Sequence, residues 1–167
     1  MSTATSLPVR MLLNTDGTVT ALLEACFGAP VVVDTVANEV DDRLPTPLEL
    51  EVEPNRPVLW RQVVLRVDDR PVLRASSVLA LDRLDDRARA ALLAGDEPIG
   101  NVLRRFDTRR ELLSQADGEA TAADELDLGV DSDERVHARA YRILSAGRPL
   151  AIVTERIPAS IFDPLEP

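Results

Sequence analysis

Two strand–turn–strand units constrain the fold of this chain more than any other feature. The segments 58–67 and 72–81 are rich in Val and Leu and are joined by Asp68-Asp69-Arg70-Pro71, whose residues favour a turn. Val136–Leu144 and Leu150–Ile157 repeat the arrangement around a second short turn. Because short turns join antiparallel neighbours, we expect both units to be β-hairpins.

Each expected hairpin carries a charged residue on a face that is otherwise apolar. Successive side chains of a strand point to opposite faces, which places Arg61 with Leu59 and Val63, and Glu155 with Val153. A charge that faces a core is costly unless another group pairs with it. The sequence therefore predicts either a buried Arg–Glu ion pair or a pocket in which the two groups meet a ligand.

The remaining segments predict a mixture of short helices and strands. Helical patterns cover 19–27, which ends at Gly28, and 83–94, and Pro98 suits the first turn of a helix near 97–103. Further strand-like segments are 31–37, 108–113 and, within a Pro-rich loop, 48–52. Because helices and strands do not alternate regularly, we expect an α+β fold, an antiparallel β-sheet of about six strands covered by short helices.

The expected domain covers residues 9–162 as a single unit. We expect a flexible N-terminus over 1–8 and an irregular tail over 163–167. The acidic stretch 118–134 is poor in aromatic residues and is expected to be a solvated loop, with a lid over a pocket as the alternative.

Composition narrows the partners that the chain can have. It holds 29 acidic and 19 basic residues, and a surface with a net charge of −10 repels phosphate, so we expect no nucleic acid partner. No apolar run approaches the roughly 20 residues that cross a bilayer, so we expect no membrane partner. The N-terminus lacks the pattern of a secretory signal, which favours the cytoplasm. With one cysteine, Cys26, and one histidine, His137, we expect neither a disulfide nor a metal site.

Four segments, taken in order, resemble the chorismate lyase family, and most closely its shorter, chorismate-lyase-like bacterial branch. They are Leu12–Thr20, Trp60–Leu65 with Val72–Ser77, Glu97–Leu103, and Tyr141–Pro149 continuing to Thr154-Glu155. The resemblance spans residues 10–162, nearly the whole chain. Enzymes of this family remove pyruvate from chorismate to give 4-hydroxybenzoate. The resemblance implies a lyase that needs no metal or organic cofactor and that takes a small-molecule carboxylate.

The resemblance also assigns roles to particular positions. It makes Arg61 the substrate-binding arginine and Glu155 the acidic group of the site, and we expect these two to be the catalytic residues. It assigns a backbone contact with the ligand to Ile99, and Val19 stands where the family pattern has methionine. A guanidinium fits a carboxylate through two hydrogen bonds, and backbone N–H groups near Ile99 and Gly100 could hold an anion. We expect Glu155 to protonate the departing enolpyruvyl group.

The sequence departs from the family at Ser76, where the best-known lyases carry a second arginine. We keep Ser76 among the expected substrate-binding residues, although serine cannot replace the charge. Arg74 lies two residues away on the same face of the strand and is a candidate substitute.

Two other functions stay open at this point. The same fold resembles the effector-sensing domains of some transcription regulators, but this chain has no room for a winged helix before residue 10. Alternatively, an enzyme of specialised metabolism could keep the fold and change the substrate, as the departure at Ser76 suggests. The sequence is compatible with a monomer or a small homo-oligomer.

Overall fold

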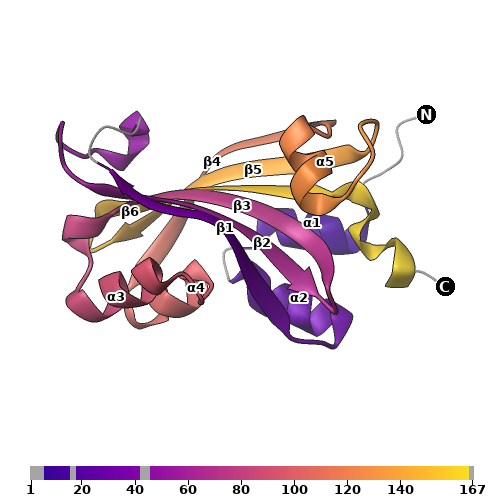
Figure 1. Cartoon of the computed structure of the whole chain (residues 1–167), viewed down its shortest axis with the longest axis horizontal. Helices are drawn as coiled ribbons and strands as arrows, with labels where there is room; N and C mark the ends of the chain where they lie inside the picture. Colours follow the sequence, from indigo (N-terminus) through magenta and orange to yellow (C-terminus); the bar gives the residue numbers. More distant parts are fainter. Residues whose placement is uncertain (1–5, 16–17, 42–45, 166–167) are drawn as a thin grey trace.

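A single antiparallel sheet organises the protein. The computed structural model describes residues 6–15, 18–41 and 46–165. Its six strands are β1 (Val31–Asp41), β2 (Val58–Val67), β3 (Arg70–Ala80), β4 (Thr108–Glu119), β5 (Arg135–Ser145) and β6 (Arg148–Pro158). They lie in the order β1-β2-β3-β6-β5-β4 (Figure 1). The expected α+β class is confirmed, and both hairpins form as the alternating patterns predict.

Two pairs of helices cover one face of the sheet, as Figure 1 shows. The helices are α1 (Leu7–Asn14), α2 (Val19–Phe27), α3 (Asp86–Ala94), α4 (Ile99–Val102) and α5 (Ala122–Leu128). Helices α1 and α2 pack on one end of this face around Leu12, Leu23 and Leu73. Helices α3 and α4 pack on the other end around Leu92 and Leu79. The pocket described below is lined by residues at the start of α2 and of α4, one from each pair.

Tight turns set the registers of the two hairpins. Asp68 and Asp69 have positive φ angles of 47° and 62°, and Ala146 and Gly147 have 50° and 76°. Two consecutive residues with positive φ are typical of the two-residue hairpin turn whose twist matches that of its strands. The first turn is therefore shorter than expected, and Arg70 already belongs to β3.

Several boundaries differ from the sequence expectations. The predicted helix at 19–27 is confirmed, but α1 begins at Leu7, within the segment that was expected to be flexible. The predicted strand at 48–52 is wrong, because Leu48–Leu50 forms one turn of 3₁₀ helix. Two more 3₁₀ turns, Leu81–Arg83 and Leu103–Arg105, flank the α3–α4 pair. A 3₁₀ segment, Ala159–Leu165, replaces the start of the irregular tail.

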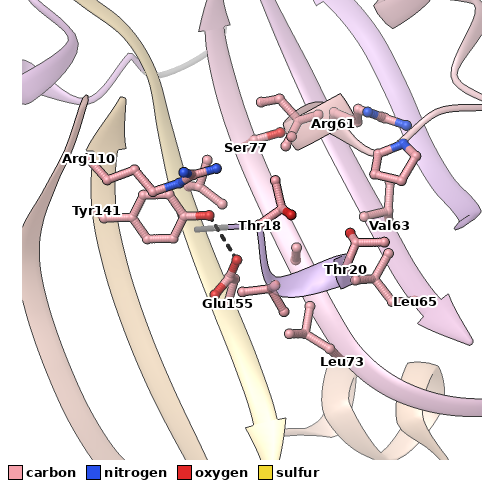
Figure 2. A pocket seen from close by; sticks show the side chains of 16 residues that line it. Thr18, Thr20, Arg61, Val63, Leu65, Leu73, Ser77, Arg110, Tyr141 and Glu155 are labelled. Carbon is pink, nitrogen blue, oxygen red and sulfur yellow. Dashed lines mark hydrogen bonds between the residues drawn. The ribbon is translucent and has the colours of Figure 1, made fainter. Parts of the chain in front are cut away.

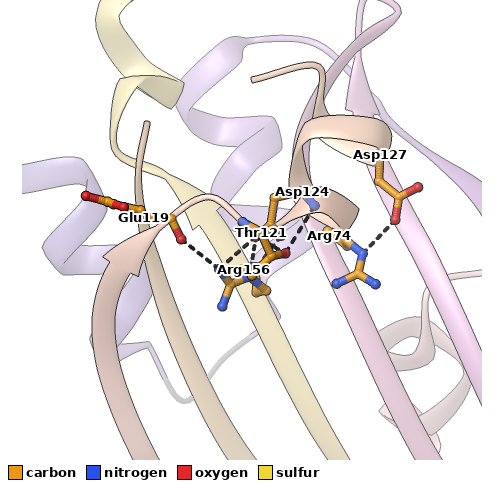
Figure 3. A network of polar contacts seen from close by, with 6 residues as sticks. All are labelled: Arg74, Glu119, Thr121, Asp124, Asp127 and Arg156. Carbon is orange, nitrogen blue, oxygen red and sulfur yellow. Dashed lines mark hydrogen bonds and ion pairs between the residues drawn. The ribbon is translucent and has the colours of Figure 1, made fainter. Parts of the chain in front are cut away.

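The acidic stretch 118–134 is not a solvated loop, because strand β4 continues to Glu119 and helix α5 follows. Thr121 and Asp124 form a reciprocal capping box at the start of α5. Asp124 is fully buried and accepts hydrogen bonds from Arg156 Nε at 2.8 Å to each of its oxygens (Figure 3). Arg74 Nε binds Asp127 at 2.6 Å in the same way. Helix α5 therefore lies on the reverse face of the sheet and is not a lid over the space between the helix pairs.

The buried carboxylate of Asp124 should make stability depend on pH. Burial alone would raise its pKa, but hydrogen bonds from Arg156 and Thr121 outweigh burial and hold the pKa below its usual range. A lowered pKa in the folded state stabilises the protein at neutral pH, and this contribution is lost as the pH falls below about 4. We expect Asp124→Asn to lower the free energy of unfolding at pH 7 by about 2 kcal/mol, and to flatten its decline in acid. Urea titrations from neutral to acid pH measure both effects.

Asp133→Asn is the matched control, because Asp133 is exposed. An Asp124→Asn protein as stable as Asp133→Asn across this pH range would contradict the role given to the α5 cap.

Candidate functional site

A hollow lies on the sheet between the two helix pairs. It encloses about 560 Å³, including open solvent at its mouth. Five of the residues expected from the sequence line it, namely Val19, Arg61, Ile99, Gly100 and Glu155 (Figure 2). The hollow also contains Thr18, Thr20, Val63, Leu65, Leu73, Ala75, Ser77, Pro98, Arg110, Tyr141 and Val153. Much of the lining is aliphatic, and Arg61, Arg110 and Glu155 are its charged members.

Arg61 projects from β2 toward the connection between α3 and α4. Its side chain is 2% exposed, and its Nη2 donates to the carbonyl oxygens of Gly95 and Glu97, both at 2.7 Å. Its Nε is buried and makes no hydrogen bond within the described residues. Burial lowers the pKa of Arg61, and the charge of Asp96 partly offsets that effect. Since arginine titrates far above neutrality, Arg61 keeps its positive charge inside the hollow.

Glu155 pairs with Arg139 and not with Arg61. The carboxyl group is 4% exposed, and its Oε2 accepts from Arg139 Nε at 2.6 Å. Its Oε1 accepts from the hydroxyl of Tyr141 at 2.8 Å. The ion pair between Arg61 and Glu155, one of the two alternatives drawn from the sequence, is therefore not formed, and the two side chains instead line one hollow. Arg139, the partner of Glu155, comes from β5, a strand on the other side of β6 from β3.

Arg139 also ties the end of α1 to the site. Its Nη1 donates to the carbonyl oxygens of Leu13 and Thr15, each at 3.1 Å. These carbonyls lie at the C-terminal end of α1, where helix carbonyls lack intrahelical partners. One guanidinium thus neutralises Glu155 and anchors the chain beside the hollow.

Tyr141 stays a neutral hydrogen-bond donor. Burial raises its pKa well above the usual value, the neighbouring charge of Glu155 raises it further, and Arg110 and Arg139 only partly counter the rise. The Cζ atoms of Arg139 and Arg110 lie 5.1 and 5.8 Å from the centre of its ring, within range of cation–π attraction. Sequence reasoning did not single out Tyr141, although it shares a strand face with Arg139.

Ser76 does not reach the hollow. Strand β3 presents Leu73, Ala75 and Ser77 to it, so Ser76 points to the reverse face. Arg74 lies on that reverse face too and is bound to Asp127 of α5, so it cannot take the place of a second arginine. The register pairs Arg61 with Ser77, so Ser77 is the residue beside Arg61.

Gly100 lets α4 approach the start of α2. A Cβ atom on Gly100 would lie 2.8 Å from Cγ2 of Thr18 and 3.9 Å from Nη2 of Arg110. These distances bring Thr18, Gly100 and Arg110 together at one rim of the hollow, as Figure 2 indicates for Thr18 and Arg110. A methyl group at this position would overlap Thr18, so Thr18 or a helix beside it would have to shift.

Residues 6–15, 18–41 and 46–165 contain no group of three or more His, Cys, Asp or Glu side chains placed to hold a metal ion. No helix in these ranges is long and apolar enough to cross a membrane.

The sequence matches a family model described as "Chorismate pyruvate-lyase Rv2949c-like" over residues 13–164. The chain belongs to this family. The match covers every strand and the whole lining of the hollow, so the resemblance seen in four short segments extends over the complete domain.

Curated relatives agree with the family assignment. The chorismate pyruvate-lyase of Mycobacterium tuberculosis strain H37Rv is 30% identical over 162 residues, which cover 92% of this chain and 81% of the relative. The chorismate pyruvate-lyase of Mycobacterium leprae is 29% identical over 92% of this chain and 75% of the relative. A protein named putative lyase MJ0807 of Methanocaldococcus jannaschii is 28% identical over 87% and 75%.

Solved structures support the fold. PhnF from Mycobacterium smegmatis superposes with a TM-score of 0.70 at 16% identity, over 87% of this chain and 65% of its own length. The ligand-binding domain of a putative GntR-family regulator from Bordetella bronchiseptica gives a TM-score of 0.65 at 14% identity, over 76% and 84%. At these identities the likeness shows a shared fold alone.

The close contact at Gly100 gives a test that needs no ligand. We expect Gly100→Ala to lower the melting temperature by several degrees, because the new methyl group overlaps Thr18 and either α2 or α4 must shift. Thr18→Ser removes the colliding Cγ2 and keeps the hydroxyl, so it should restore most of the loss in the Gly100→Ala background. Thermal unfolding of the two single variants and the double variant measures this.

Gly118→Ala is the control, since nothing lies within 4 Å of a Cβ atom at that position. Equal effects of the alanine at both positions, or no rescue by Thr18→Ser, would contradict the contact.

Proposed function

We propose that this protein is a chorismate pyruvate-lyase, which eliminates pyruvate from chorismate to give 4-hydroxybenzoate. The observation that supports the proposal most is the convergence of a buried arginine, Arg61, and a buried carboxyl group, Glu155, on one small hollow. Family membership and curated relatives with that name support the same reaction.

The hollow offers distinct surfaces to the parts of chorismate. The ring carboxylate would lie against Arg61 and the backbone at Ile99 and Gly100. Arg61 also fixes this backbone, since its hydrogen bonds to Gly95 and Glu97 hold the residues that lead into α4. The diene ring would lie on the aliphatic floor formed by Val63 and its neighbours.

The elimination breaks two bonds on adjacent ring carbons. The electron pair of the C–H bond at the carbon that bears the hydroxyl becomes the new ring double bond. The neighbouring C–O bond breaks at the same time, and its electrons leave with the oxygen as enolpyruvate. Enolpyruvate takes up a proton on its methylene carbon to give pyruvate, and aromatisation of the ring supplies the driving force.

Glu155 is the carboxyl group that lines the hollow, and it pairs with Arg139 at 2.6 Å. We assign it as the base that takes the ring proton, after which it can return that proton to the leaving group. This reverses the order expected from the sequence, where Glu155 began as the acid. Tyr141 keeps the carboxylate oriented through its hydroxyl.

A changed substrate is the second candidate. The strand that carries Arg74 and Ser76 gives the hollow no cation, and Ser77 stands beside Arg61. A relative of chorismate with one carboxylate fewer would fit this arrangement as well. Assaying purified protein for release of both pyruvate and 4-hydroxybenzoate from chorismate decides between the two, and absence of both products from folded protein would exclude the lyase.

Replacement of Glu155 tests its role in proton transfer. We expect Glu155→Gln to reduce turnover of chorismate by about 10²-fold or more, because the amide cannot accept the ring proton. Ligand affinity should change much less, since Tyr141 can still donate to the amide oxygen. Pyruvate release followed by a coupled assay gives turnover, and calorimetry with 4-hydroxybenzoate gives affinity.

Glu119→Gln is the matched control, because Glu119 is exposed at the far end of β4. Glu155→Asp retains the charge for Arg139 and withdraws the carboxylate by one methylene, so it should fold and still turn over slowly. Full activity of Glu155→Gln would remove Glu155 from the reaction.

A further inference from the structure

We propose that Arg110 binds the enolpyruvyl carboxylate of the substrate and so replaces the second arginine that β3 lacks. This inference rests on the proposed function, and it names the residue that makes the site specific for a dicarboxylate. Arg110 comes from β4, an edge strand that β3, β6 and β5 separate from β2.

The position of Arg110 is fixed by three observations. It lines the hollow together with Arg61 and Glu155. Its Cζ lies 5.8 Å from the centre of the Tyr141 ring. Its Nη2 lies 3.9 Å from the place of a Cβ on Gly100. The guanidinium therefore lies between the Tyr141 ring and Gly100 of α4, and Figure 2 shows it beside Tyr141.

The supply of positive charge in the hollow favours this role. Of the described residues that line it, Arg61 and Arg110 are the two with positive charge. Arg139 donates to Glu155 and to the carbonyls of Leu13 and Thr15, and it is not part of the lining. A dianion placed in a buried hollow needs a cation near each carboxylate, because an unpaired buried charge is strongly unfavourable. Since Arg61 and Arg110 are the cations of the lining, we assign one carboxylate to each of them.

The shared contact with Tyr141 decides which carboxylate Arg110 binds. Tyr141 touches Glu155 through its hydroxyl and Arg110 through its ring face, so Glu155 and Arg110 lie at the same end of the hollow. In chorismate the enolpyruvyl carboxylate is attached to the carbon that bears the ether oxygen. When Glu155 reaches the carbons that undergo elimination, this carboxylate falls at the end occupied by Arg110. The ring carboxylate then points toward Arg61 and Ile99.

The product provides the discriminating probe, because 4-hydroxybenzoate keeps the ring carboxylate and lacks the enolpyruvyl one. Binding is measured by calorimetry in the Glu155→Gln background, in which we expect chorismate to be consumed at least about 10²-fold more slowly. We expect Arg110→Gln to weaken chorismate binding by roughly 10- to 100-fold and 4-hydroxybenzoate binding by less than about twofold. Arg110→Lys keeps the charge but lacks the planar guanidinium, so its affinity for chorismate should lie between that of the protein with Arg110 and that of Arg110→Gln.

Arg109→Gln is the matched control. Arg109 is the preceding residue on β4, points to the other face and pairs with Glu111 in an exposed position, so its loss changes net charge equally. It should alter neither affinity. Equal weakening of both ligands by Arg110→Gln, or weakening of neither, would overturn the inference.

The outcomes separate this inference from the proposed function. A wild-type protein that turns over chorismate, combined with an Arg110→Gln variant lacking selectivity, overturns the role of Arg110 alone. A protein that binds chorismate in an Arg110-dependent manner without releasing pyruvate overturns the lyase activity alone. Binding of neither chorismate nor 4-hydroxybenzoate overturns both.

Discussion

The pairing of β3 with β6 is the contact on which the rest of the site depends. Each hairpin is a local structure whose turn sets its own register, but neither hairpin alone encloses a hollow. Six residue pairs from Arg74 with Arg156 to Leu79 with Ala151 align the two hairpins edge to edge. Because Ala75 lies opposite Glu155 and Ser77 opposite Val153, the apolar faces of both hairpins become one continuous surface. Arg61 and Glu155 reach the same hollow through this alignment.

Charges are tolerated inside this surface because each one has a fixed partner. Arg61 is held by two backbone carbonyls, and Glu155 is held by Arg139 and Tyr141. Buried polar groups that are already hydrogen-bonded do not need to reorganise when a ligand arrives. The hollow therefore presents an oriented carboxylate and an oriented guanidinium at its two ends. Such preorganisation would favour the elimination that we propose.

The fold could be predicted from the sequence where local patterns decide the structure. The two hairpins, the helix closed by Gly28 and the faces of Arg61 and Glu155 follow from strand alternation and turn chemistry. Helix α5 could not be predicted in this way. Its acidic composition is typical of a solvated loop, and it folds because Arg74 and Arg156, distant in sequence, neutralise Asp127 and Asp124.

The candidate site was predictable in part for the same reason. Five expected residues line the hollow. The resemblance to the family pointed to Ser76, but the register of β3 with β2 places Ser77, one residue later, beside Arg61. Tyr141, whose hydroxyl donates to Glu155, was not among the expected residues. Arg110 could not be predicted, because Arg109 and Arg110 are neighbours on one strand and point to opposite faces. Only the pairing of β4 with β5 shows which of them faces the hollow.

Strands β3 and β6 use both of their faces for separate purposes. On one face they supply Leu73, Ser77 and Glu155 to the hollow, and on the other they supply Arg74 and Arg156 to α5. Inserting or deleting one residue in either strand would exchange the two sets of side chains at once. Homologues that diverge in side-chain identity along these strands should thus preserve their spacing, and changes in chain length should accumulate in the connections outside them.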